Sequence, residues 1–160
     1  MTAEKEKIVI RPYMEEDWTA IEEIHDAARR LELEKAGLPE AFVPLKEAAV
    51  SEGLFDYQID VALLEKTVVG FCAYTEEELA WLYVLPKRMR TGIGRQLIQH
   101  ALGKEPGIRY IEVLLGNEPA KCLYEKMGFE VTEVLSGQMP GNELFAVRVY
   151  LMERRKLLGI

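Results

Sequence analysis

A basic, glycine-containing segment at residues 86–96 constrains the fold of this chain more than any other feature. It reads Pro-Lys-Arg-Met-Arg-Thr-Gly-Ile-Gly-Arg-Gln and follows the apolar run Leu79 to Leu85. This order predicts a strand, a loop and the start of a helix. Such a loop presents backbone N–H groups at the positive end of a helix dipole, which suits a phosphate or pyrophosphate. Gly92 and Gly94 lack a Cβ atom, so a ligand could approach the backbone closely there. The other interpretation is an ordinary strand-to-helix turn with solvated basic side chains.

The spacing of the glycines excludes two well-known phosphate loops. A P-loop needs a glycine, four residues and then Gly-Lys-Ser/Thr, and no such run occurs in this chain. A dinucleotide fingerprint needs a third glycine three residues after the second, where this chain has Leu97. The ligand of this loop is therefore neither a nucleotide in a P-loop nor NAD on a Rossmann fold.

A second informative segment lies downstream of a predicted buried strand, Ile108 to Leu115. Asn117 is a good N-cap and Gly128 a natural C-terminal stop, so a helix is expected between them. Its inward-facing positions recur at helical spacing: Ala120, Leu123, Tyr124 and Met127. Tyr124 either fills the core with a satisfied hydroxyl or faces the ligand of the glycine loop, because both helices would flank the same pair of strands.

The segment from Leu79 to Phe129 resembles the core of the GNAT family of acyl-CoA-dependent N-acetyltransferases. The matching residues are Tyr83-Val84-Leu85-Pro86, Gly92-Ile93-Gly94 and Asn117 through Phe129. The opening strand at residues 8–12 and the acidic helix start at residues 15–17 are also similar to the family. One departure is Met89, which stands where the family usually has Gln or Arg. The resemblance spans nearly the whole chain and implies one domain over residues 1–160.

The fold implied by this resemblance is α/β (α+β). A central mixed, mostly antiparallel seven-stranded sheet would splay apart between strands 4 and 5 and be flanked by about four helices. The sequence pattern predicts a helix from Trp18 to about Ala36 and a second from Glu40 to Gly53. It also predicts a closing strand pair, Phe129 to Leu135 and Leu144 to Met152, joined by a loop at residues 136–142.

The activity implied by the resemblance is transfer of an acetyl group from acetyl-CoA to an amine by direct attack on the thioester, with no metal. The departing thiolate has a reference pKa of about 8.5 and a tyrosine one of about 10, so Tyr124 could protonate it. Asn117 would orient the pantetheine arm or Tyr124. The positions that correspond to cofactor-binding residues are Leu82, Tyr83, Val84, Met89, Arg90, Thr91, Gly92, Ile93, Gly94, Arg95, Asn117, Ala120 and Tyr124.

The sequence does not assign the base that takes the proton of the amine. Family members often place a glutamate inside strand 4, where this chain has Ala80 and Trp81. The candidates are Glu76, Glu77 and Glu78 at the start of that strand, or His25, Glu32 and Glu34 on the first helix. His25 is expected to be an exposed helical residue. A different interpretation of the whole chain is a catalytically weak, acetyl-CoA-binding sensor or partner module of the same fold.

The amino-acid composition restricts the classes of molecule that this protein is expected to bind. A net charge of −7 argues against a nucleic-acid binder and mildly favours a cationic acceptor, either a small molecule or a peptide amine. No apolar run is long enough to span a membrane. The two cysteines, Cys72 and Cys122, have no metal-like spacing and are expected to be buried thiols in a reducing compartment, which predicts a cytoplasmic protein. The closing strands and the apolar run at residues 144–151 offer an edge for a homodimer.

Overall fold

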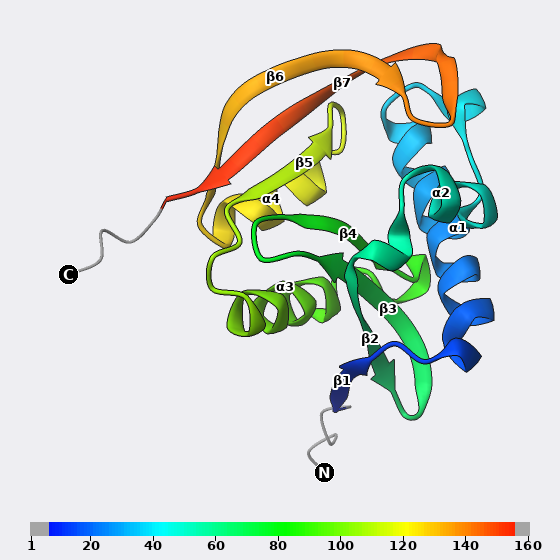
Figure 1. Cartoon of the computed structure of the whole chain (residues 1–160), viewed down its shortest axis with the longest axis vertical. Coiled ribbons are helices and arrows are strands. Elements are labelled where there is room, and N and C mark those ends of the chain that lie inside the picture. The colour runs from blue at the N-terminus through cyan, green and yellow to red at the C-terminus, as the bar shows by residue number, and fades with distance from the viewer. Residues whose placement is uncertain (1–6, 156–160) are drawn as a thin grey trace.

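The computed structural model describes residues 7–155, which form two antiparallel sheets. The first sheet has the order β1-β2-β3-β4, and the second has the order β5-β7-β6 (Figure 1). The strands are β1 (Ile8–Pro12), β2 (Gln58–Leu64), β3 (Thr67–Tyr74), β4 (Leu79–Val84), β5 (Tyr110–Leu114), β6 (Phe129–Met139) and β7 (Asn142–Arg154). The expected α+β class and the seven strands are confirmed, but the strands are divided between two sheets.

The two sheets meet at a single point between β4 and β5. A parallel bridge joins Glu78 to Tyr110, and the N–H groups of Arg109 and Tyr110 donate to the Glu77 carbonyl at 2.8 and 3.1 Å. Beyond this bridge the two strands diverge (Figure 1). The predicted separation between strands 4 and 5 is therefore present, and each of these strands leaves one hydrogen-bonding edge facing the gap.

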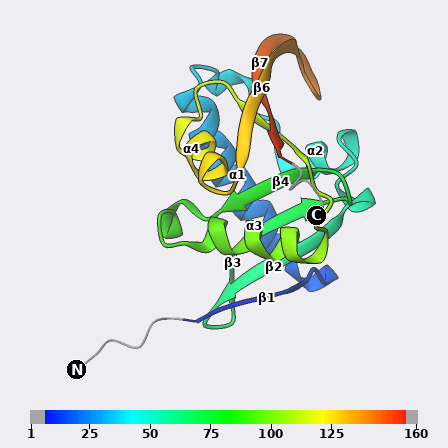
Figure 2. The same cartoon turned by 90° about the vertical axis from the view of Figure 1, so that its left-hand side faces the viewer.

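Four α-helices cover the sheets: α1 (Trp18–Lys35), α2 (Leu45–Ser51), α3 (Ile93–Lys104) and α4 (Glu118–Lys126). Helices α1 and α2 pack on one face of the first sheet, where Ile21 and Leu45 meet Phe71. Helix α3 covers the opposite face, and Leu97 belongs to a second core that also contains Tyr124 of α4 (Figure 2). The first sheet is thus sandwiched, and α4 lies on the same side as α3.

The second helix is shorter than the sequence pattern predicts. Residues 39–41 form a single 3-10 turn, Phe42 is extended, and α2 begins only at Leu45. Pro44 explains the difference, because a proline disfavours the helical conformation of the residue before it and suits the position at which a helix begins.

The closing strands are longer than predicted. The expected loop at residues 136–142 is mostly strand, since β6 runs to Met139 and β7 starts at Asn142, with Pro140 and Gly141 at the turn. Ser136 and Gly137 pair with Arg148 and Val147. Their polar and glycine character indicated a loop, but this part of the hairpin is an exposed two-stranded ribbon, which needs no apolar face.

The cysteines differ in environment. Cys72 is buried in β3 as expected, whereas Cys122 in α4 is exposed, so the prediction of two buried thiols is wrong for the second. Cys122 occupies the solvent side of an amphipathic helix whose inward positions include Tyr124 and Leu123. Within residues 7–155, no helix has the length and apolarity needed to cross a membrane.

Candidate active site

The glycine loop ends in a left-handed turn that leads directly into α3. Arg90 and Gly92 have φ angles of +65° and +88°, and α3 begins at the next residue, Ile93. The first N–H that reaches back to the loop belongs to Gln96, which donates to the Gly92 carbonyl at 3.0 Å. The N–H groups of residues 93–95 precede that bond and have no acceptor within the helix. The loop therefore leaves N–H groups at the start of α3 without a partner in the helix, an arrangement that suits an anion.

A cavity of about 450 Å³, here called the loop cavity, lies between this loop, β4, α1 and α4. All the predicted cofactor-binding residues line it except Thr91 and Ile93. Ile93 is buried in the core, and the Thr91 hydroxyl donates to the Arg88 carbonyl at 2.5 Å. Further basic side chains at the cavity are Lys35, Arg88 and Lys126.

The two glycines of the loop differ in what a side chain would meet there. A Cβ atom added to Gly92 would have no neighbour within 4 Å. A Cβ atom added to Gly94 would lie 3.4 Å from Leu123 Cδ2 and 3.8 Å from Val84 Cγ2, and both of these side chains line the loop cavity. A side chain at position 94 would therefore occupy the cavity, while glycine leaves it open.

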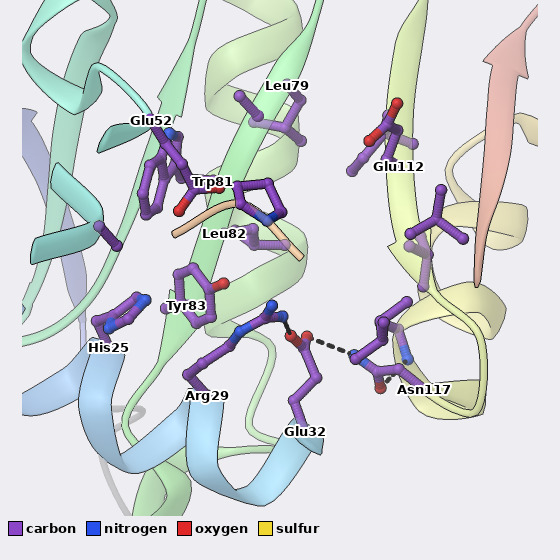
Figure 3. A pocket seen from close by; sticks show the side chains of 18 of the residues that line it. His25, Arg29, Glu32, Glu52, Leu79, Trp81, Leu82, Tyr83, Glu112 and Asn117 are labelled. Carbon is purple, nitrogen blue, oxygen red and sulfur yellow. Dashed lines mark hydrogen bonds and ion pairs between the residues drawn. The ribbon is translucent and has the colours of Figure 1, made fainter. Parts of the chain in front are cut away.

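A second cavity of about 290 Å³, here called the acidic cavity, lies between β4, β5, α1, α2 and the tip of the β6–β7 hairpin (Figure 3). Four carboxylates line it: Glu32, Glu52, Glu78 and Glu112. The two cavities share the lining residues Glu32, Leu82, Tyr83, Asn117, Ala120 and Tyr124. They therefore meet in the gap between β4 and β5.

Glu32 organises this meeting point. Its carboxylate forms an ion pair with Arg29 and accepts a hydrogen bond of 2.8 Å from Asn117 Nδ2 (Figure 3). The Oδ1 atom of Asn117 in turn accepts from the Ala120 N–H at 3.4 Å and caps α4, as its position in the sequence predicts. Burial alone would lower the pKa of Arg29, but Tyr83 and Glu32 outweigh it and raise that pKa. Arg29 is thus a permanent cation held by Glu32.

Tyr124 lies where the two cavities meet. The residue is 6% exposed, and its ring packs edge-on against Phe129 at 6.2 Å. Its hydroxyl makes no hydrogen bond with residues 7–155, so the core interpretation with a satisfied hydroxyl does not describe it. Burial, followed by the charge of Glu32, raises its pKa. The phenol is therefore a neutral donor facing the cavities.

His25 is not the exposed helical residue that the sequence suggested. It is 2% exposed, and its ring centroid lies 4.8 Å from that of Tyr83. Its Nδ1 atom is 2.9 Å from Asp26 Oδ1, which also accepts the N–H of Leu45 at the start of α2. Burial lowers the pKa of the imidazole, while Asp26 opposes this shift. His25 is thus a buried neutral group that helps to join α1 to α2. The buried face of α1 includes this polar residue as well as the apolar ones, which the sequence pattern did not indicate.

The glutamates that the sequence offered as other candidate bases differ in whether they line a cavity. Glu76, Glu77 and Glu34 line neither cavity. Glu78 lines the acidic cavity and accepts a hydrogen bond of 3.0 Å from the Tyr57 hydroxyl. Burial, followed by Glu78, raises the pKa of Tyr57 to about 12.

Glu112 was missed by the sequence analysis. It projects from β5 into the acidic cavity and has no hydrogen bond or ion pair with residues 7–155 (Figure 3). The available signal was a carboxylate between two buried residues, Ile111 and Val113, in a short strand. Such a residue must lie on the strand face opposite to the core.

Comparison with known proteins agrees with this arrangement. Residues 56–131 match the acetyltransferase (GNAT) domain model. The chain is 37% identical over 87 residues to the peptidyl-lysine N-acetyltransferase YjaB of Salmonella typhimurium, an alignment that covers 54% of this chain and 59% of that protein. The chain thus spans about three fifths of the length of this curated relative.

Solved structures share the fold over almost the whole chain. A GCN5-related N-acetyltransferase from Rhodopseudomonas palustris has a TM-score of 0.72 at 21% identity, covering 96% of this chain and 98% of that one. The PaiA N-acetyltransferase of Thermoplasma acidophilum, determined in complex with coenzyme A, has a TM-score of 0.63 at 21% identity, covering 93% and 99%. At this identity the likeness establishes the fold.

Proposed function

Since residues 56–131 match the acetyltransferase (GNAT) domain model and the fold is shared with GNAT structures, we propose that this chain belongs to the GNAT family and transfers an acetyl group from acetyl-CoA to the nitrogen of an amine. The observation that carries this proposal is the meeting of two cavities at Tyr124, one beside an anion-binding loop and the other lined by carboxylates. Each cavity suits one of the two substrates.

The loop cavity fits coenzyme A. The N–H groups at the start of α3 and the side chains of Arg88, Arg90 and Arg95 would hold the pyrophosphate. The β4 edge that faces the gap has N–H and C=O groups unpaired by β5, so it suits an extended amide-containing arm near residues 82–84. Bound there, acetyl-CoA supplies an activated acetyl group.

Tyr124 and Glu112 would handle the protons. An alkylammonium has a pKa of about 10.4, so it must lose a proton before its nitrogen can attack. Glu112 takes this proton through water and passes it to solvent. As the new N–C bond forms and the C–S bond breaks, Tyr124 gives its proton to the sulfur and regains one from the nitrogen. The products are the amide and the free thiol, with one proton released.

The test of this function is release of free thiol from acetyl-CoA by the purified protein across a panel of amines. We expect saturable turnover with at least one primary amine. The competing function, an acetyl-CoA sensor, is supported by Met89 in the loop cavity, where the family usually has Gln or Arg. Saturable acetyl-CoA binding with no turnover on any amine would favour the sensor and contradict the enzyme.

The setting of this activity is also part of the proposal. The acceptor is a small-molecule or peptide amine, and the protein acts in the cytoplasm, where its two free cysteines would stay reduced. It assembles as a homodimer through the exposed edge of β6. Nucleic acid and membranes are not among its partners, given the net charge of −7.

A further inference from the structure

Two of the four carboxylates in the acidic cavity have no partner within residues 7–155. Glu32 is held by Arg29 and Asn117, and Glu78 accepts the Tyr57 hydroxyl. Glu52 and Glu112 form neither a hydrogen bond nor an ion pair there. The cation of the cavity, Arg29, is committed to Glu32, so it does not neutralise these two by contact.

The two unpaired carboxylates enter the cavity from opposite sides. Glu52 directly follows α2, whereas Glu112 projects from β5 (Figure 3). Glu52 is exposed to solvent, although the protein around it raises its pKa through burial, an effect that Arg29 partly opposes. Two unpaired carboxylates that line one cavity repel each other and attract a ligand that brings positive charge to both.

The hairpin tip forms a roof over this cavity. Met139 and Pro140 line it, and a Cβ atom added to the neighbouring Gly141 would lie 3.4 Å from Ser51 Oγ and 3.8 Å from Val43 Cγ1. The tip of the ribbon therefore packs against the segment that contains α2. A covered space of about 290 Å³ suits a short flexible molecule better than the surface of a folded protein.

A separate observation, the environment of Tyr124, indicates at which end of the acidic cavity the reaction would occur. Tyr124 is 6% exposed and lines both cavities, and its hydroxyl makes no hydrogen bond with residues 7–155. Glu112 lies on β5, the strand that precedes Asn117 and α4, whereas Glu52 follows α2 on the opposite side of the cavity (Figure 3). The two carboxylates therefore have different places relative to the reaction.

We propose that the acceptor is a short, unbranched diamine, whose reacting amino group lies on the Glu112 side and whose second ammonium group is bound by Glu52. This inference rests on the proposed acetyltransferase function. Only one amino group is acetylated, and the second keeps its proton and its charge throughout. A monoamine of the same length would leave Glu52 without a cationic partner, so its binding would lack that charge pair.

The test is thiol release from acetyl-CoA with terminal diamines of three, four and five carbons, each compared with the monoamine of equal carbon number. A lysine-containing peptide with a blocked amino terminus is assayed alongside. We expect kcat/KM to be at least about tenfold higher for the best diamine than for its monoamine, because a close charge pair is gained. Glu52→Gln should reduce this ratio about tenfold or more, whereas Glu47→Gln should keep it, because Glu47 lies on α2 and lines neither cavity.

The possible results distinguish failure of the diamine inference from failure of the proposed acetyltransferase function. Turnover with equal kcat/KM for diamines and monoamines, or a faster reaction with the lysine peptide than with every diamine, would overturn the diamine while retaining the acetyltransferase. A diamine preference that survives Glu52→Gln would also overturn it. No thiol release with any amine would overturn the proposed function and the inference together.

Discussion

Glu32 on α1 and Asn117 at the start of α4 are joined by a hydrogen bond of 2.8 Å across 85 residues of sequence. This bond links the helix that covers the first sheet to the junction between β5 and α4. It crosses the gap at which the two cavities meet, so it ties the geometry of the proposed reaction centre to the relative position of the two sheets.

Replacing Glu32 should therefore damage stability and activity together. Glu32→Ala leaves the Arg29 guanidinium and the Asn117 amide without their carboxylate partner, at a cost of about 1–3 kcal/mol in the free energy of unfolding. Glu34→Ala is the control, since Glu34 is an exposed residue of the same helix that lines neither cavity. Denaturant unfolding and kcat/KM for the best amine measure both effects. Wild-type values for Glu32→Ala would show that the bond has no such role.

Replacing Tyr124 by phenylalanine should lower kcat without lowering stability. The change removes only a hydroxyl that makes no hydrogen bond with residues 7–155, so the fold loses little. General acid catalysis contributes roughly 10²–10⁴-fold, and a decrease of at least about tenfold in kcat is expected. Tyr110→Phe, a tyrosine of β5 outside both cavities, is the control. An unchanged kcat with a lower melting temperature would remove Tyr124 from the mechanism.

Replacing Gly94 by valine should abolish most of the stabilisation that acetyl-CoA gives. The new side chain would point at Leu123 and Val84 in the loop cavity, at distances that the free protein tolerates. A ligand that binds only the folded state raises the melting temperature by mass action, so the loss appears as a smaller thermal shift. Gly103→Val provides a matched change on α3, because a Cβ atom there meets nothing within 4 Å. Equal shifts in the two variants would place the ligand elsewhere.

Asp17 should make the stability of the protein depend on pH in the acid range. The carboxylate is buried and accepts two hydrogen bonds from Arg11, at 2.7 and 2.9 Å, and one from the Met14 N–H at 2.8 Å. The hydrogen bond from Arg11 lowers its pKa, although burial opposes the shift. The unfolded chain, with an ordinary pKa of about 3.9, then takes up a proton first as the pH falls. The contribution of Asp17 is thus complete above that value and is lost as the pH falls through the lower folded-state pKa.

The corresponding variant is Asp17→Asn. We expect it to lose about 1–3 kcal/mol of unfolding free energy at pH 7 and to approach the wild type below about pH 4. Chemical unfolding at a series of pH values measures the difference, with Glu23→Gln, an exposed carboxylate of α1, as the control. A difference that stays constant from pH 7 to pH 3 would contradict the assignment.

The proposed homodimer predicts a mass twice that of the chain in light scattering at micromolar concentration. Strand β6 is the outer strand of its sheet and carries exposed Val131, Val134 and Leu135. Val134→Lys should shift the mass toward the monomer, because a charge at a pairing edge opposes association. Val9→Lys, at an exposed valine of β1, should not. A monomer for the unmodified protein would reject the dimer.

Sequence patterns predicted the parts of the fold in which local chemistry and packing agree. The Asn117 cap, the Gly92 turn and the long stripe of α1 all appear where they were expected. The later start of α2 could also have been predicted, because Pro44 restricts the conformation of the residue before it. The apolar pattern at residues 40–53 indicated a longer helix instead.

The missed features depend on tertiary context. His25 is buried because aromatic residues of β4 lie opposite it, and no local pattern encodes that contact. Glu112 faces a cavity only because β5 separates from β4, so its role depends on a gap between strands from different sheets. Likewise, the polar ribbon of residues 136–139 pairs with β7 through backbone bonds, which place few demands on its side chains.

The separation of β4 from β5 also affects how the protein can aggregate. Each strand pairs on one side only, with β3 and β7 respectively, so each has unpaired backbone groups that would ordinarily template another chain. Here both edges face a gap that is also lined by residues of α1 and α4, which makes these edges harder for a foreign strand to reach. A molecule that fills the gap would cover the same backbone, so substrate occupancy should slow aggregation as well as unfolding.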